Sequence, residues 1–178
     1  MVPKNKTILS WDKVLDGCFD LADKIVETPF EVSSMVLVPL IRGGLPIATI
    51  LSSRLNNMPI FPVSLDNLEL LKNVVEKYKT IIVVADVFKN DLSALGDALC
   101  AFGGHYNKSM VEGRNFVLCC LTAPLNTNQD DFHRFFSAFN LMDVLISFPW
   151  DVESLFDDGN AVFYDYVREY AGFRRDLK

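Results

Sequence analysis

Residues 35–55 read MVLVPLIRGGLPIATILSSRL and predict a strand, a glycine-rich turn and a helix. The apolar run 35–40 has no polar position, which is typical of a strand buried on both faces of a parallel sheet. Gly43 and Gly44 mark the turn, and Pro46 follows in the first helical turn, where its missing N–H costs nothing. Four apolar residues recur at helical spacing and predict the buried stripe of this helix: Ile47, Ile50, Leu51 and Leu55.

The same alternation of strand and helix continues on both sides of this stretch. We expect an amphipathic helix over residues 11–27, capped by Ser10, and a charged helix-compatible pattern within 66–79 that is a possible lid insertion. Alternating strands and helices imply right-handed crossovers, a mostly parallel sheet and flanking helices. Further strands are expected at 60–65, 81–84, 116–121 and 144–147, and further helices at 92–102, 131–139 (short and aromatic) and 160–172.

Composition favours a single globular α/β domain over residues 1–178. The chain is 50% apolar and 22% charged, which is enough to build one core. Its net charge of −6 argues against nucleic acid as a partner, because binding to phosphates needs clustered Lys and Arg. Residues 1–10 lack an apolar signal region, and no run of about 18 apolar residues occurs. We therefore expect a cytoplasmic protein without a membrane partner.

The cysteines and histidines indicate neither a metal site nor nucleophilic catalysis. Four cysteines occur without a CxxC pair, so we expect reduced core thiols and no metal. His105 and His133 stand outside any motif with Ser, Cys or carboxylate at catalytic spacing. The acidic pairs at 130–131 and 157–158 are more typical of solvated helix caps than of cation ligands.

Ligands of such sheets bind at the carboxyl ends of the strands, which directs attention to loops 41–44 and 85–91. Glycine lets a backbone approach a diphosphate, neighbouring N–H groups donate to it, and Arg42 would add a charge-assisted fork. The same residues also fit a tight strand-to-helix turn with a solvated arginine. Residue spacing alone leaves both interpretations open.

Three segments together resemble the bacterial xanthine-guanine phosphoribosyltransferases, a type I family that joins a purine to the ribose phosphate of phosphoribosyl pyrophosphate (PRPP). They are Ser10-Trp11-Asp12, the run 36–46 with its Arg-Gly-Gly-Leu core, and Phe148-Pro149-Trp150-Asp151. The likeness spans residues 7 to about 155. It implies the type I phosphoribosyltransferase fold, with a small C-terminal hood and C-terminal helix within 140–178.

The resemblance also implies roles for particular residues. It places pyrophosphate or phosphate contacts at Arg42, Gly43, Gly44 and Ser93, and the ribose contact at Asp86. The purine would lie near Trp150 and Leu145. The catalytic group stays unknown, with Asp86 and Asp151 as candidates.

The chain departs from the family pattern where PRPP should bind. Ala85 replaces the first acid of an acidic pair, Lys89 replaces the aspartate that acts on the base, and Asp91 replaces a phosphate-loop glycine. Two like charges about 4 Å apart repel by roughly 4 kcal/mol at an effective dielectric near 20, or about a thousandfold in binding. On the purine side, Ala123 replaces a lysine and Leu145 a stacking aromatic residue. The PRPP site therefore lacks several side chains that the family uses, and we call it eroded in this sense.

Two functional hypotheses follow. The first is a phosphoribosyltransferase-like protein with an eroded PRPP site, serving as a binding, regulatory or assembly module with weak or no catalysis and taking a phosphorylated small molecule or nucleotide. The second is an active nucleobase (purine) phosphoribosyltransferase that uses Mg²⁺ and makes a nucleoside monophosphate and pyrophosphate. Mg²⁺ is expected only in the second case. We favour the first hypothesis because the missing groups are those that hold ribose and move a proton.

Self-association is a further expectation from the resemblance, because the family fold usually forms homo-oligomers. Four phenylalanines could supply the interface or form a buried aromatic helix face: Phe132, Phe135, Phe136 and Phe139.

Overall fold

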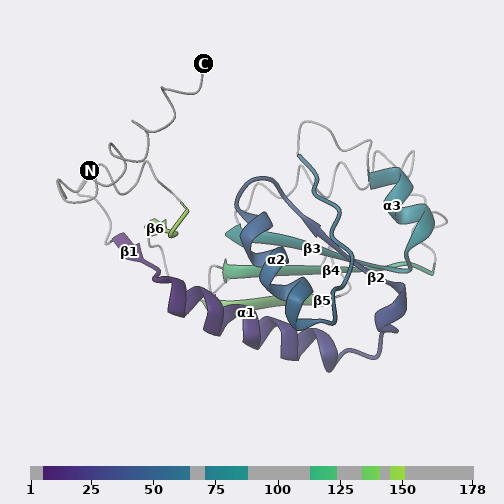
Figure 1. Cartoon of the computed structure of the whole chain (residues 1–178), viewed down its shortest axis with the longest axis horizontal. Helices are drawn as coiled ribbons and strands as arrows, with labels where there is room; N and C mark the ends of the chain where they lie inside the picture. Colours follow the sequence, from purple (N-terminus) through teal and green to yellow (C-terminus); the bar gives the residue numbers. More distant parts are fainter. Residues whose placement is uncertain (1–5, 65–70, 88–112, 124–133, 141–144, 151–178) are drawn as a thin grey trace, which may run out of the picture. The chain divides into compact units, whose positions relative to one another are not determined.

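The structure is a computed structural model that describes residues 6–64, 71–87, 113–123, 134–140 and 145–150 (Figure 1). The chain divides into two compact units. The larger comprises residues 12–143, and the smaller joins residues 1–11 to 144–178. The expectation of one domain over residues 1–178 stays a prediction.

The larger unit is built on a parallel sheet of four strands, in the order β2-β3-β4-β5 (Figure 1). The strands are β2 (Met35–Pro39), β3 (Thr80–Val87), β4 (Asn115–Ala123) and β5 (Arg134–Asn140). Each neighbouring pair runs parallel. The expected α/β fold with a mostly parallel sheet is confirmed.

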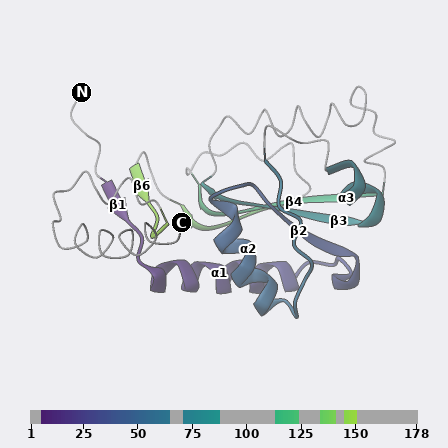
Figure 2. The same cartoon turned by 45° about the horizontal axis from the view of Figure 1, so that its top comes forward.

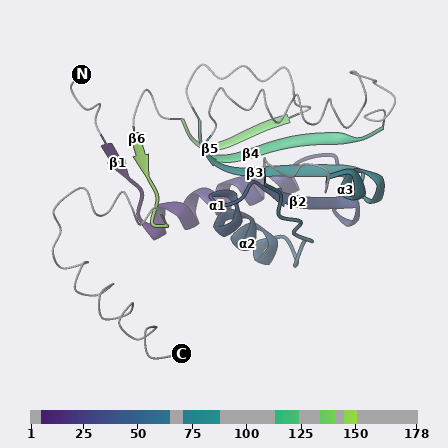
Figure 3. The same ribbon diagram turned by 90° about the horizontal axis from the view of Figure 1, so that it is seen from above.

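Helices lie on both faces of this sheet (Figures 2 and 3). One face carries α1 (Trp11–Val26), all of which except its first residue belongs to the larger unit, and α2 (Gly44–Arg54). The opposite face carries α3 (Leu71–Lys77), and a short 3-10 turn, η1 (Val32–Ser34), precedes β2. The expected helix at 11–27 is confirmed within one residue, and the helix expected after the glycine turn is confirmed. Of its predicted buried stripe, Ile47, Leu51 and Leu55 are buried, but Ile50 is only half-buried.

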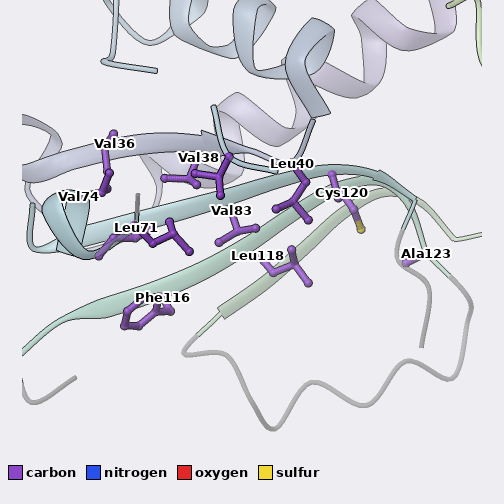
Figure 4. Close-up of a cluster of buried hydrophobic side chains, with 13 residues drawn as sticks. Val36, Val38, Leu40, Leu71, Val74, Val83, Phe116, Leu118, Cys120 and Ala123 are labelled. Carbon is purple, nitrogen blue, oxygen red and sulfur yellow. The ribbon is translucent and has the colours of Figure 1, made fainter. Parts of the chain in front are cut away.

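The core on the α3 face comes from alternate positions of the strands, because successive side chains of a strand point to opposite faces. Figure 4 shows the side chains of three adjacent strands converging on Leu71 and Val74 of α3. The strand residues of this cluster include Val36, Val38, Ile81, Val83, Ala85, Phe116, Leu118 and Cys120.

On the other face, α1 approaches β4 and β5 through Gly17. A Cβ built on Gly17 would lie 2.8 Å from Leu121 Cδ1, 2.9 Å from a ring carbon of Phe139 and 3.0 Å from the Cβ of Ala138. The helix is also tied to β5 by Lys24, whose Nζ donates to the carbonyl of Ser137 at 2.9 Å. Glycine at position 17 thus sets how closely α1 packs on the sheet.

The smaller unit contains a two-stranded parallel sheet that sequence reasoning missed. In it β1 (Lys6–Ile8) pairs with β6 (Leu145–Ser147), with Thr7 opposite Ile146. The strand at 144–147 was expected, but as part of the main sheet. Three residues are too few for an alternation of apolar and polar side chains to identify a strand from sequence.

Two other expectations need correction. The aromatic segment 131–139 was expected to form a short helix, but Arg134–Asn140 forms strand β5. Phe135, Phe136 and Phe139 are half-buried there, so they do not form the helix face considered above; Phe132 lies outside the described residues. Within the expected strand 60–65, the described residues 60–64 form two isolated bridges instead, pairing Ile60 with Leu37 and Val63 with Leu40.

Several expectations concern residues that the structure does not describe. The helices at 92–102 and 160–172, most of the hood and part of the possible lid lie outside the described residues. Within the described part of the chain, no helix is long and apolar enough to cross a membrane.

The described cysteines are free thiols: Cys18, Cys119 and Cys120, all buried. Burial raises the pKa of the Cys18 thiol from 9.0 to about 12. Burial, followed by the neighbouring Cys120, also raises the pKa of Cys119. Buried protonated thiols are inert, which agrees with the expected packing role.

Replacing Gly17 by Ala should destabilise the protein by about 1–3 kcal/mol, because the added methyl group overpacks the contact with Leu121 and Phe139. This loss should appear although alanine favours helix by about 1 kcal/mol. Urea unfolding measures it, with Asp16→Ala, on the exposed side of the same helix, as the matched control. A Gly17→Ala protein at least as stable as Asp16→Ala would contradict the packing described here.

The raised pKa of Cys18 predicts a loss of stability in alkaline solution. The unfolded chain ionises this thiol near pH 9 and the folded chain only near pH 12, so the contribution is complete below about pH 9 and falls above it. The expected slope is about 1 kcal/mol per pH unit. Urea unfolding between about pH 8 and 11 should show a shallower decline in Cys18→Ala than in the wild type. Parallel curves would show that the thiol ionises equally in both states.

Candidate functional site

The candidate site is the segment of residues 41–45, called the loop 41–45 here, which comprises the end of the connection from β2 and the first two residues of α2. The Gly44 N–H donates to the carbonyl of Leu40 at 2.9 Å, and the Leu45 N–H donates to the carbonyl of Arg42 at 3.2 Å. The peptide bond between Ile41 and Arg42 is cis. The predicted turn is thus present, and it leads directly into the first turn of α2.

Two neighbouring segments hold the start of the loop. The Leu40 N–H donates to the carbonyl of Val84 on β3, and the Ile41 N–H donates to the carbonyl of Val63, both at 2.9 Å. The loop therefore leaves β2 between the end of β3 and the segment around Val63. Its position follows from backbone hydrogen bonds on both sides.

Gly44 is required by a close approach of backbones. A Cβ built at this position would overlap the carbonyl of Val84, a backbone group that has no alternative rotamer. The start of α2 therefore packs directly against β3. The strand order makes this possible, because β2 and β3 are neighbours.

Gly43 brings the loop against Asp86. The backbone of Gly43 has helical angles, φ −63° and ψ −32°, which any residue can adopt. A Cβ built on it would nevertheless overlap the carboxyl group of Asp86. Glycine is needed here because that carboxyl occupies the space, and the two loops singled out from the sequence meet at this contact.

The carboxyl of Asp86 is held near the end of β3. Its Oδ1 accepts the N–H of Val87 at 2.8 Å, and the residue is half-buried. Thr122, fully buried on β4, donates its hydroxyl to the Asp86 carbonyl at 3.3 Å. Sequence reasoning missed Thr122; a polar residue within an otherwise apolar strand was the available signal.

Ala85 points away from this site. It is 4% exposed and belongs to the apolar cluster on the α3 face, together with Leu40, Val63 and Ala123. Figure 4 shows Ala123 at the same end of the cluster as Leu40. A carboxylate at position 85 would be placed among apolar side chains, where burying an unpaired charge is costly.

The rest of the loop faces solvent. Arg42 is exposed, as are the apolar side chains on either side of it, Ile41 at 47% and Leu45 at 39%. Among the residues that the structure describes, no group of three or more His, Cys, Asp or Glu side chains is arranged to hold a metal ion.

The residues expected at the base lie in the smaller unit. Trp150 stacks on Phe148, with ring centroids 4.9 Å apart and planes 5° apart, and its ring is 5.7 Å from that of Trp11. The buried Nε1 of Trp150 has no acceptor among the described residues. Leu145 lies in β6. Ser93, Asp151 and the substituted positions 89–91 lie outside the described residues.

The Gly43 contact predicts a coupling with Asp86. Gly43→Ala should destabilise the protein by about 1–3 kcal/mol, and the loss should shrink by about 1 kcal/mol or more in an Asp86→Ala background, which removes the overlapping carboxyl. Gly44→Ala is the matched control, because its overlap is with a backbone carbonyl that Asp86→Ala leaves in place. Urea unfolding of the five variants measures both cycles. Equal coupling at positions 43 and 44 would contradict the geometry.

No protein-family model matches the sequence, and no curated protein sequence matches it significantly. Solved structures do match its fold. A protein from Neisseria gonorrhoeae with bound ppGpp superposes with a TM-score of 0.63 at 18% identity, over 85% of this chain and 92% of that one.

Two phosphoribosyltransferases match over a similar extent. The Helicobacter pylori xanthine-guanine-hypoxanthine phosphoribosyltransferase has a TM-score of 0.60 at 18% identity, over 85% of this chain and 95% of that one. The Pyrococcus horikoshii purine phosphoribosyltransferase has a TM-score of 0.55 at 21% identity, over 82% and 94% of the two chains. The chain therefore has the fold of the purine phosphoribosyltransferases.

Proposed function

We propose that this chain is a phosphoribosyltransferase-like protein that binds a phosphorylated nucleotide at the loop 41–45, with weak or no catalysis, and that it serves as a binding, regulatory or assembly module. One observation carries the proposal. Of the two consecutive side chains at the end of β3, Asp86 contacts the loop and Ala85 is buried in an apolar cluster.

The binding half of the proposal rests on the loop. Arg42 is exposed and carries a guanidinium, which suits the paired oxygens of a diphosphate. The N–H groups of Gly44 and Leu45 already donate inside the loop. Those of Arg42 and Gly43 have no backbone acceptor within the part of the chain that the structure describes, and we assign them to the ligand. Glycine at position 43 adds no side chain of its own, and the space where a Cβ would lie is occupied by the Asp86 carboxyl.

The catalytic half of the proposal rests on what the site lacks. The family pattern has an acidic pair at the end of this strand, whereas this chain has one acid, Asp86, because position 85 is an alanine buried in the apolar cluster. The sequence also has Lys89 and Asp91 where the family has a proton acceptor and a phosphate-loop glycine. PRPP needs partners for its 5′-phosphate and for its pyrophosphate, and this site lacks several of them. A nucleotide that binds through one diphosphate needs fewer partners.

The proposal of a nucleotide ligand is supported by the Neisseria gonorrhoeae structure with bound ppGpp, a purine nucleotide with two diphosphate groups. A ligand of this kind would be held by one diphosphate at the loop. Asp86 beside the loop disfavours additional negative charge, unless a cation accompanies the ligand. ppGpp and GDP are therefore the first ligands to test.

The alternative is an active purine phosphoribosyltransferase. It is favoured by the contact between Gly43 and Asp86, because Asp86 is the residue expected at the ribose. In this case Asp86 would offer a carboxylate oxygen to Mg²⁺ carried with PRPP, and Asp151 would be the candidate base. The two candidates differ in whether pyrophosphate is released.

Calorimetric titration tests the binding half. We expect ppGpp or GDP to bind the wild type, and Arg42→Ala to weaken binding about 10-fold to 100-fold, because a charge-assisted hydrogen bond contributes about 1.5–3 kcal/mol. Arg54→Ala, at the other end of α2, is the matched control and should bind as the wild type does. Equal affinities of Arg42→Ala and the wild type would remove the loop from the binding site.

Measurement of pyrophosphate release tests the catalytic half. With PRPP, Mg²⁺ and each common purine in turn, the wild type should release no more pyrophosphate than Asp86→Asn. Multiple turnovers that disappear in Asp86→Asn would establish the catalytic alternative and contradict the proposal.

A further inference from the structure

The outer surface of α1 carries two adjacent stripes of different chemistry. At about 100° per residue, Leu15, Phe19 and Val26 fall within an arc of about 40° on the helix circumference. They flank the buried side of the helix, which packs on the sheet through Val14, Cys18, Leu21 and Ile25. We call these three residues the apolar stripe.

The apolar stripe faces solvent. Leu15 is 37% exposed, Phe19 42% and Val26 62%. Single exposed apolar residues are ordinary, but here three are aligned along about three turns of one helix. Such a stripe is typical of a surface that a partner covers.

An acidic stripe runs beside it. Asp12, Asp16 and Asp23 fall within about 40° of arc next to the apolar stripe. Glu27 directly follows the helix and its N–H donates to the Asp23 carbonyl at 3.0 Å, and all four residues are exposed. Asp20, farther round the helix, is paired with Lys24 at 2.6 Å. Carboxylates therefore line one long edge of the apolar stripe.

The chain itself shows which side chain this surface attracts. The guanidinium of Arg54, at the end of α2, lies over the ring of Phe19, 5.1 Å from its centroid. A cation over an aromatic face is favourable because the face of the ring is electronegative. The Phe19 ring thus already accepts a cation of this chain, and the carboxylates along the edge carry the charge opposite to that of Lys and Arg.

We propose that the outer face of α1 is a docking surface for a basic amphipathic helix of another protein, whose apolar side covers Leu15, Phe19 and Val26 and whose Lys or Arg side chains meet Asp12, Asp16, Asp23 and Glu27. Charge complementarity selects this occupant. This surface is separate from the loop 41–45, so the proposal holds whether or not that loop binds a nucleotide.

A second copy of this chain fits the surface less well. Two α1 helices packed on each other by a twofold axis would each contribute the same acidic stripe to one interface. Like charges at close distance oppose such pairing. Any self-association of the chain should therefore use another surface.

Fluorescence anisotropy with a labelled helical peptide of about 18 residues, made only of Leu and Lys with Leu on one face, tests the proposal directly. We expect binding by the wild type that weakens as the salt concentration rises, and no binding of the same peptide with Glu in place of Lys. Leu15→Ser with Phe19→Ser should weaken binding about tenfold. Asp16→Asn with Asp23→Asn should weaken it about threefold or more.

Val32→Ser is the matched control, because Val32 is 48% exposed but lies on η1 rather than on α1. It should leave the affinity unchanged, and thermal unfolding of each variant verifies that the fold is intact. The proposal is wrong if the Glu peptide binds as tightly as the Lys peptide, or if Val32→Ser weakens binding as much as the paired stripe variant. It is also wrong if the Lys peptide fails to bind while Leu15→Ser with Phe19→Ser converts a dimer into a monomer in sedimentation.

Discussion

The close approach of α2 to β3 is the constraint on which the rest of the candidate site depends. It exists because Gly44 has no side chain, so that the first turn of the helix can lie against the carbonyl of Val84. Hydrogen bonds from Leu40 to Val84 and from Ile41 to Val63 then fix the strand end from both sides. Once these backbones are in contact, Gly43 is brought against the end of β3, where Asp86 follows Val84 on the same face of the sheet.

This geometry also explains why the two positions at the end of β3 have different environments. Successive strand residues face opposite sides, so only one of two neighbours can contact the loop. Asp86 does so, while Ala85 closes the apolar cluster that α3 covers (Figure 4). Of the two positions only Asp86 supplies a carboxylate, so this strand end has one acid where the family pattern has two, which supports the proposal of binding with little catalysis.

The sequence predicted the structure best where the spacing of apolar residues and the turn-forming glycines indicated the same elements. An apolar run predicted β2 to within one residue, and two glycines followed by a helical stripe predicted the loop and the presence of α2. Aromatic residues of β5 were misassigned because Phe135, Phe136 and Phe139 fit one helical face as well as a half-buried strand, and long-range pairing with β4 decides between them. The site was predicted in part. Proximity of the two loops followed from the parallel topology, but the requirement for glycine at position 43 arises from the Asp86 carboxyl, a contact that only the folded chain reveals.

The most direct test of the account is a crystal structure of the protein grown with ppGpp. We expect one diphosphate to lie at the start of α2, with phosphate oxygens about 2.8–3.2 Å from the backbone nitrogens of Arg42 and Gly43 and from the Arg42 guanidinium. A nucleotide bound with its phosphates away from residues 41–45 would contradict the assignment of this loop as the ligand site.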